Sequence, residues 1–321
     1  MLNKPEPHHG ERTTPPAFFE GPEKKVELAV HEGGRSLRSL GHGTWERVVR
    51  SAKAEVLSRR SNDHFDAYLL SESSLFVADS YLTMITCGRT QLVNAVELMF
   101  ELLGKDELEY LFYERKNEHF PHAQPSSFFE DAARLRALVP GKAHRFGLEH
   151  EHAVRVFHWT DGFEPEPEDT TLEILMHSLP ETLTQPGRIT EALGLREILD
   201  APLVDEFAFE PTGYSMNAIS GRTYFTVHVT PEAVGSYVSV ETNLPLNGNL
   251  APLVERTVKV FRPESFDIVA FMPHSGELPS RVTGYELRKH VHEPLGGYHV
   301  TFQHHYRPST GPQRAFSIPI E

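Results

Sequence analysis

The chain has 321 residues, of which 39% are apolar, and 31 Lys plus Arg against 45 Asp plus Glu give a net charge of −14. This length allows one large or two ordinary domains. The acidic balance argues against a nucleic acid partner and favours either solubility or a cationic small-molecule ligand. A single cysteine excludes an internal disulfide, and no apolar run reaches membrane-spanning length. We therefore expect a cytoplasmic protein without a membrane partner.

The first 17 residues are rich in proline among polar and charged neighbours. They lack the apolar core of a signal peptide. This composition predicts a disordered leader over residues 1–17.

Two helices are predicted in the first half of the chain. Over residues 92–103 the apolar side chains recur on one helical face, with Thr90 as the candidate N-cap and Gly104 as the stop. A capping-box pattern from Ser127 to Glu130 starts the second helix.

The sequence also predicts strands and an internal repeat. Alternating polarity at 153–159 and 224–230 is typical of half-buried strands. An acidic, proline-broken stretch, 161–168, separates two halves, about 18–160 and 169–321. In both halves a Ser-Tyr strand start precedes an amphipathic helix: 80–83 before 92–103, and 236–239 before 250–261. This order predicts a duplicated unit whose helices each cover one face of a mostly antiparallel sheet.

The segment from Leu70 to Ser74, Leu-Ser-Glu-Ser-Ser, joins two strand-like runs, 65–70 and 75–77. A serine hydroxyl held beside the preceding carbonyl in a tight turn suits an N-to-O acyl shift, although two serines at a turn are also ordinary turn chemistry. The lone Cys87 is either a buried small apolar residue or a reactive thiol.

Five segments occur in family-like order: Phe18 to Lys24, Leu70 to Ser74, Thr86 to Gly88, Gly213 to Asn217, and His228 to Glu232. Together they resemble the eukaryotic-type S-adenosylmethionine decarboxylases, from about Phe18 to the C-terminus. The resemblance implies an α+β fold, a four-layer αββα sandwich in which both halves form a single domain over residues 18–321.

The resemblance also implies self-cleavage between Glu72 and Ser73. Ser73 would attack the Glu72 carbonyl, and β-elimination would leave a pyruvoyl group at position 73. Residues 1–72 and 73–321 would stay associated. A pyruvoyl group is an electron sink for loss of CO2 through a Schiff base, which here would serve spermidine and spermine synthesis.

Residue roles follow from the matched motifs. His228 resembles the base for the Ser73 Cα proton, assisted by Ser215, and Cys87 resembles the acid that protonates the product. The resemblance implies adenine stacking by Phe19 and Phe209, ribose binding by Glu232, a substrate contact at Glu72, and acidic roles at the site for Glu20 and Glu23. Without it, the ordinary readings are favoured: a satisfied strand histidine, a turn serine, core aromatics and solvated acids.

Members activated by putrescine bind the diamine in a buried acidic cluster with a lysine. The matching residues here are Glu27, Asp169, Thr171, Glu173 and Glu241, but Ile85 stands at the lysine position. An apolar side chain cannot balance these carboxylates. Either another cation fills the gap or the cluster is rewired, so activation by putrescine is left open.

Nineteen histidines raise the question of a metal. The candidate groups are His144 with His150 and His152, and His290 with His292, Glu293, His304 and His305. Their spacings match no familiar zinc pattern, and we predict no metal.

Two alternatives remain. One is a pyruvoyl enzyme acting on ornithine or arginine, against which Phe19, Phe209 and Glu232 argue. The other is a non-catalytic paralogue that activates a partner, against which the presence of Ser73, Cys87, Ser215 and His228 argues. The sequence is compatible with a monomer or a homodimer.

Overall fold

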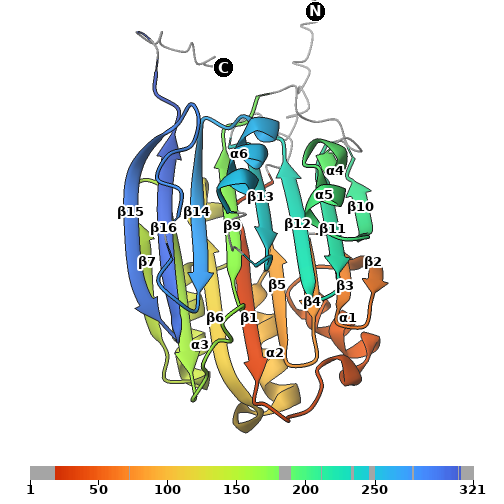
Figure 1. Ribbon diagram of the computed structural model, residues 1–321. Coiled ribbons are helices and arrows are strands. Elements are labelled where there is room, and N and C mark those ends of the chain that lie inside the picture. Colours follow the sequence, from red (N-terminus) through yellow and green to blue (C-terminus); the bar gives the residue numbers. More distant parts are fainter. Residues whose placement is uncertain are drawn as a thin grey trace, which may run out of the picture.

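Two eight-stranded antiparallel sheets dominate the computed structural model (Figure 1). The structure describes residues 19–71, 73–180, 189–210, 212–232, 235–245, 250–276, 278–309 and 311. The predicted leader, 1–17, and Glu72 lie outside these described residues.

The first sheet has the order β2-β3-β4-β5-β1-β6-β8-β7. Its strands are β1 (Lys24–Val30), β2 (Val56–Ser61), β3 (Asp66–Leu70), β4 (Ser73–Val77), β5 (Tyr81–Thr86), β6 (Leu108–Lys116), β7 (Lys142–Gly147) and β8 (Ala153–Thr160). Because β4 begins at Ser73, both serines of the Glu-Ser-Ser segment lie in a strand, whereas the sequence predicted them in the turn.

The second sheet has the order β10-β11-β12-β13-β9-β14-β16-β15. Its strands are β9 (Thr171–His177), β10 (Leu203–Ala208), β11 (Tyr214–Ser220), β12 (Thr223–Thr230), β13 (Tyr237–Thr242), β14 (Ser265–Met272), β15 (Glu286–Leu295) and β16 (Tyr298–Tyr306). Each strand occupies the place of the strand eight earlier in the first sheet, so the predicted repeat of the two halves is confirmed.

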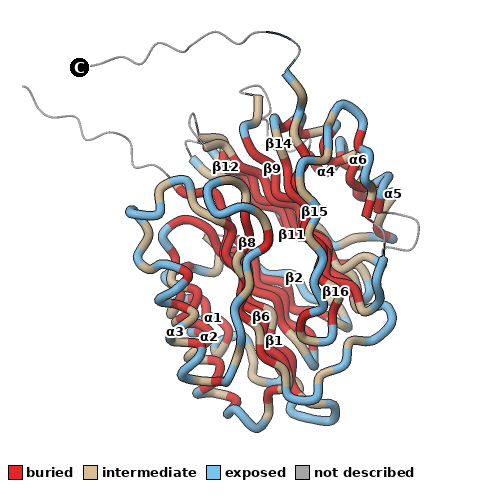
Figure 2. Tube along the Cα trace, turned by 90° about the vertical axis from the view of Figure 1, so that its left-hand side faces the viewer, coloured by how far each residue is buried: buried red, intermediate tan, exposed pale blue. Residues whose placement is uncertain are grey.

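Helices cover the outer faces of the sheets (Figure 2). They are α1 (His42–Ser51), α2 (Leu92–Leu103) and α3 (Phe128–Leu138) on the first sheet, and α4 (Ile189–Ala192), α5 (Leu195–Ile198) and α6 (Leu250–Phe261) on the second. Short 3-10 helices span Arg38–Leu40, Lys105–Glu107 and Pro121–Ala123. Among the described residues, none of the helices is both long and apolar enough to cross a membrane.

Helix ends follow the sequence with one exception. Ser127 and Glu130 form the predicted capping box of α3, and Gly104 follows α2 with a φ of 82°, which favours glycine. The expected cap at Thr90 is wrong, because Gln91 precedes α2 and the Thr90 hydroxyl instead donates to the Cys87 carbonyl at 2.9 Å.

The sheets pack face to face, which gives the four-layer sandwich that was expected (Figures 1 and 2). Apolar clusters fill the space between each sheet and its helices. The space between the sheets is mixed. Aromatic clusters there lie beside buried polar and charged side chains, including Glu114, Lys116, Glu173 and Asp267. Buried charges need partners, so this inner layer is where a functional site is expected.

Candidate active site

Ser73 begins β4, where it pairs with Leu70 on β3 and Thr86 on β5. It is buried, and its hydroxyl has no hydrogen-bond partner among the described residues. Its φ of 148° is in a region that a residue with a Cβ rarely adopts. Such a conformation stores backbone strain at Ser73, the residue that follows the predicted cleavage point.

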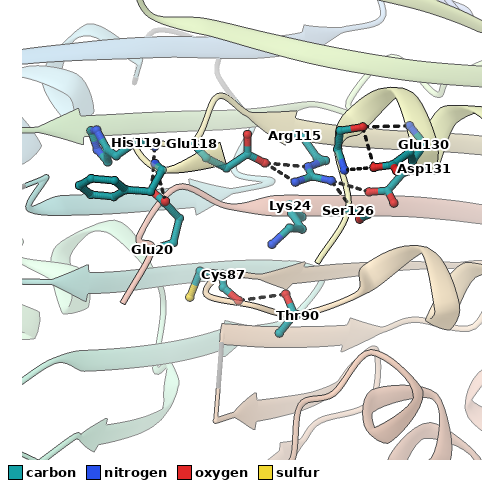
Figure 3. Close-up of polar contacts among 12 residues, drawn as sticks. Glu20, Lys24, Cys87, Thr90, Arg115, Glu118, His119, Ser126, Glu130 and Asp131 are labelled. Carbon is teal, nitrogen blue, oxygen red and sulfur yellow. Dashed lines mark hydrogen bonds and ion pairs between the residues drawn. The ribbon is translucent and has the colours of Figure 1, made fainter. Parts of the chain in front are cut away.

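Cys87 directly follows β5 and is therefore one residue from the strand partner of Ser73. Thr90 donates to the Cys87 carbonyl (Figure 3). The Lys24 ammonium donates to the Gly88 carbonyl at 3.0 Å. Lys24 lies between Arg115 and Thr86, its partners on the two neighbouring strands. Burial, and then the charge of Arg115, lower the pKa of Lys24 to about 8. The thiol is therefore held on a fixed turn near a buried amine.

His228 lies on β12 opposite Ser215 on β11, and its Nδ1 is 2.9 Å from the Ser215 hydroxyl. Its Nε2 is 2.8 Å from the Thr226 hydroxyl and 3.1 Å from the hydroxyl of Ser74 in the first sheet. Burial lowers the pKa of His228 to about 3, so the ring is neutral at pH 7. The structure thus brings the predicted base and its helper beside the residue that follows Ser73.

The two acids of the first motif differ in their surroundings. Glu20 accepts hydrogen bonds from the backbone N–H groups of His119 and Phe120, each at 2.9 Å, and so anchors that loop (Figure 3). Glu23 is buried. Burial, and then the nearby Glu173, raise the pKa of Glu23 to about 8. Glu23 therefore keeps its proton at neutral pH.

The predicted substrate-binding residues are only partly gathered. The backbone N–H of Phe19 donates to the Glu232 carboxylate at 3.2 Å. The ring of Phe209 packs edge-on against Phe207, with centroids 4.8 Å apart. Phe19 and Glu232 are thus brought together, while Phe209 is paired with an aromatic residue that the sequence analysis did not select.

Lys25 supplies the cation that the acidic cluster lacks at Ile85. Its ammonium is 2.6 Å from Glu173, 2.7 Å from Glu27 and 3.4 Å from Glu241. Lys25 and Ile85 are directly paired across β1 and β5. Burial opposes the charge of Lys25, but Glu173, followed by Glu241 and Glu27, raises the pKa of Lys25 well above its usual value.

The remaining members lie at the edge of this cluster. The Thr171 hydroxyl donates to Glu27 at 3.4 Å, and Asp169 accepts a hydrogen bond from Tyr298. Burial raises the pKa of Asp169 to about 6. Tyr224 adds a donor to Glu241 at 2.6 Å. Among the acids of the predicted cluster, Asp169 is the one without an ion pair to Lys25 in the described contacts.

Two members of the cluster were missed by the sequence analysis. Lys25 shares a strand face with Glu27 two residues later, and Glu114 on β6 pairs with Lys25. Burial, and then Glu173, raise the pKa of Glu114 well above its usual value. The period-2 pattern Phe112, Glu114, Lys116 was the available signal, because it places two charges on the face that also carries an aromatic side chain.

The histidines form different groups in the structure from those that the sequence suggested. His152, His177 and His304 surround Asp267 with nitrogen to oxygen distances of 3.8, 3.2 and 2.7 Å. His144 instead contacts the ring of His158, and His292 the ring of His299. The Lys116 ammonium is 3.0 Å from Asp267, and both side chains are fully buried. A protein cation thus already balances this carboxylate.

The chain is similar to several known proteins. The family model described as adenosylmethionine decarboxylase matches residues 16–306. The S-adenosylmethionine decarboxylase proenzyme of Dictyostelium discoideum is 31% identical over 88% of this chain and 84% of its own. The Xenopus laevis proenzyme is 33% identical over 81% of this chain and 85% of its own.

A solved structure is also similar. The crystal structure of the Trypanosoma brucei AdoMetDC-delta26 monomer superposes with a TM-score of 0.58 and 26% identity, covering 73% of this chain and 99% of that one. With the family match over residues 16–306, these similarities establish that the chain belongs to the adenosylmethionine decarboxylase family.

Proposed function

We propose that this chain is a pyruvoyl-dependent S-adenosylmethionine decarboxylase of the cytoplasm that first cleaves itself between Glu72 and Ser73. One observation supports the proposal: the strained Ser73 pairs with Thr86, the residue before Cys87, and the next residue, Ser74, contacts His228. The residues that we assign as scissile serine, base and acid therefore all lie near the start of β4.

Self-cleavage needs only groups of the chain and water. The Ser73 Oγ adds to the Glu72 carbonyl carbon, the peptide C–N bond breaks, and an ester with a free amine forms. His228 takes the Cα proton of Ser73, the Cβ–Oγ bond breaks, and Glu72 leaves as a carboxylate. The remaining enamine becomes an imine, and water hydrolyses it to a pyruvoyl group and ammonia.

The two products are expected to stay together because they share one sheet. Residues 1–72 contribute β1, β2 and β3, and β1 lies between β5 and β6 of the other product. Separation would remove a central strand and expose its buried ladder. The two products are therefore expected to remain parts of the single domain proposed for residues 18–321.

The pyruvoyl group, when formed, is the electron sink for decarboxylation. The surroundings of Ser73 fit it, since its hydroxyl is buried and unpartnered among the described residues. Cys87 is the proposed donor of the proton to the product carbon. Phe19, Phe209 and Glu232 bind the nucleoside, and the carboxylates nearby favour a sulfonium cation.

Lys25 takes over the role of an activating diamine. Its single ammonium contacts Glu27, Glu173 and Glu241, the acids expected to hold putrescine. Because these carboxylates already have a buried cation, we infer that the enzyme is active without putrescine.

The test is an intact mass spectrum of the purified protein beside a Ser73→Ala variant. We expect two chains split after Glu72, the larger lighter by one ammonia than a serine-ended fragment, and a single chain for Ser73→Ala. An uncleaved chain in both samples contradicts the proposal and favours a non-catalytic partner. CO2 release from ornithine or arginine, but not from S-adenosylmethionine, would overturn the proposed substrate assignment.

A further inference from the structure

A buried polar network links the two sheets at the proposed base. We call Ser74, Ser215, Asn217, Thr226 and His228 the His228 network, and all five residues are buried. Ser74 comes from β4, while the others lie on the paired strands β11 and β12. In such a closed network, each polar hydrogen atom has few acceptors to choose from.

The orientation of the Asn217 amide determines which groups of the network donate hydrogen bonds and which accept them. Its Nδ2 lies 3.0 Å from the backbone carbonyl oxygen of Tyr68. A carbonyl oxygen only accepts, so the amide nitrogen must face it, and the reversed amide would oppose two oxygens. The Oδ1 of Asn217 therefore faces the other way, toward the network.

Two hydroxyls converge on that oxygen. The Ser74 hydroxyl is 2.5 Å from Asn217 Oδ1, and the Thr226 hydroxyl is 2.9 Å from it. Each hydroxyl has one hydrogen, and an amide oxygen cannot donate. Both hydrogens therefore point to Asn217, and both hydroxyls have only lone pairs left for other neighbours.

Those lone pairs face Nε2 of His228, which is 2.8 Å from Thr226 Oγ1 and 3.1 Å from Ser74 Oγ. Two acceptors at this range require a hydrogen on Nε2. The buried ring is neutral, so it has one hydrogen in total and Nδ1 has a lone pair. The Ser215 hydroxyl, 2.9 Å away, donates to Nδ1.

We propose that Asn217, Thr226 and Ser74 are positioning residues that fix His228 as the Nε2–H tautomer, so that Nδ1, on the Ser215 side, is the basic nitrogen. The inference rests on the proposed self-cleavage and names its base at the level of one atom. The Cα proton of Ser73 ends on Nδ1, the C–H electrons form the Cα=Cβ bond, and the Cβ–Oγ electrons leave with the Glu72 carboxylate. Nε2 keeps its hydrogen throughout.

The tautomer can be read without any cleavage. Ring nitrogen shifts of the full chain labelled with ¹⁵N-histidine are recorded on a Ser73→Ala background. The His228 signals are identified by their loss in Ser73→Ala/His228→Gln. We expect a protonated Nε2 and an unprotonated Nδ1, with a second tautomer emerging in Ser73→Ala/Thr226→Val. A protonated Nδ1 with an unprotonated Nε2 overturns the inference, whether or not the wild-type chain cleaves.

Cleavage rates supply a second readout. Thr226→Val keeps the side-chain shape but removes the hydroxyl, and we expect processing to slow by about 10-fold or more, since a positioned base contributes about 100-fold or more. The stalled precursor should contain the ester, which hydroxylamine splits. Thr226→Ser should restore the rate. Thr257→Val, a buried threonine of α6, is the matched control. Equal rates for Thr226→Val and this control overturn the inference.

Discussion

Lys25 and Ile85 face each other across β1 and β5, and the Lys25 ammonium lies 2.6 Å from Glu173 on the opposite sheet. The cation of the acidic cluster is therefore supplied by β1, from the strand partner of Ile85. A strand partner can replace a lysine in this way because paired residues on adjacent strands have their Cβ atoms about 5 Å apart on the same face.

We expect Lys25→Met to lower stability and activity together. Removing one partner of a buried ion pair leaves uncompensated carboxylates and costs about 3–5 kcal/mol. Added putrescine should restore part of the activity of Lys25→Met, but should not stimulate the wild type. Thermal unfolding and CO2 release with and without putrescine measure both effects. The exposed Lys142→Met is the control. Strong stimulation of the wild type would mean that Lys25 does not replace the diamine.

Cys87→Ala should separate the two proposed reactions. Cys87 follows β5, whereas the proposed processing groups, Ser73, Ser215 and His228, are unchanged in this variant. We expect normal cleavage by mass spectrometry, but CO2 release reduced by about 100-fold, since a positioned acid contributes at least that much. Wild-type decarboxylation by the cleaved variant would exclude Cys87 as the proton donor.

The pH dependence of stability should reveal the proton on Glu23. Its pKa is raised to about 8 by burial, against 4.5 for the unperturbed group. Between these values the folded chain holds a proton that the unfolded chain has lost. The Glu23 contribution to the free energy of unfolding therefore falls as pH rises from about 5 to 8, by up to about 1.4 kcal/mol per unit.

Glu23→Gln removes this titration, because an amide does not ionise. Denaturant unfolding between pH 5 and 8 should give a flatter profile for the variant than for the wild type. Glu210→Gln, at an exposed acid, is the control. Parallel profiles for wild type and Glu23→Gln would show that Glu23 is already ionised.

After self-cleavage the chains 1–72 and 73–321 should elute together. The proposed break lies between β3 and β4, yet β1 keeps its ladders to β5 and β6. Size-exclusion chromatography should give one peak that contains both chains, and denaturant should be needed to separate them. Two peaks under native conditions would contradict this account of the shared sheet.

Much of the fold could be predicted from the sequence because local patterns and tertiary packing agree. The capping box at Ser127, the apolar face of residues 92–103 and the strand 224–230 all appear where the sequence predicted them. The Thr90 cap failed because its hydroxyl bonds to the Cys87 turn instead. This competing acceptor is itself local, three residues earlier in the chain, and cap propensity alone does not decide between the two hydrogen bonds.

The sequence predicted several residues of the candidate site, but not which side chains contact one another. Short motifs selected Ser73, Cys87, Ser215 and His228, whereas Lys25, Glu114, Asn217 and Thr226 were not assigned to it. Their partners come from strands far apart in sequence, such as Glu173 for Lys25. Strand register is a tertiary property, so a single sequence does not state which buried charges will meet.

Each strand of the second sheet is equivalent to the strand eight earlier in the first sheet, but equivalent strands carry different residues of the proposed site. β4 and β12 are equivalent strands of the two copies, and they carry Ser74 and His228, which touch. β1 and β9 are likewise equivalent, and they carry Lys25 and Glu173. Each copy has specialised in one member of each pair, so neither copy alone contains a complete centre.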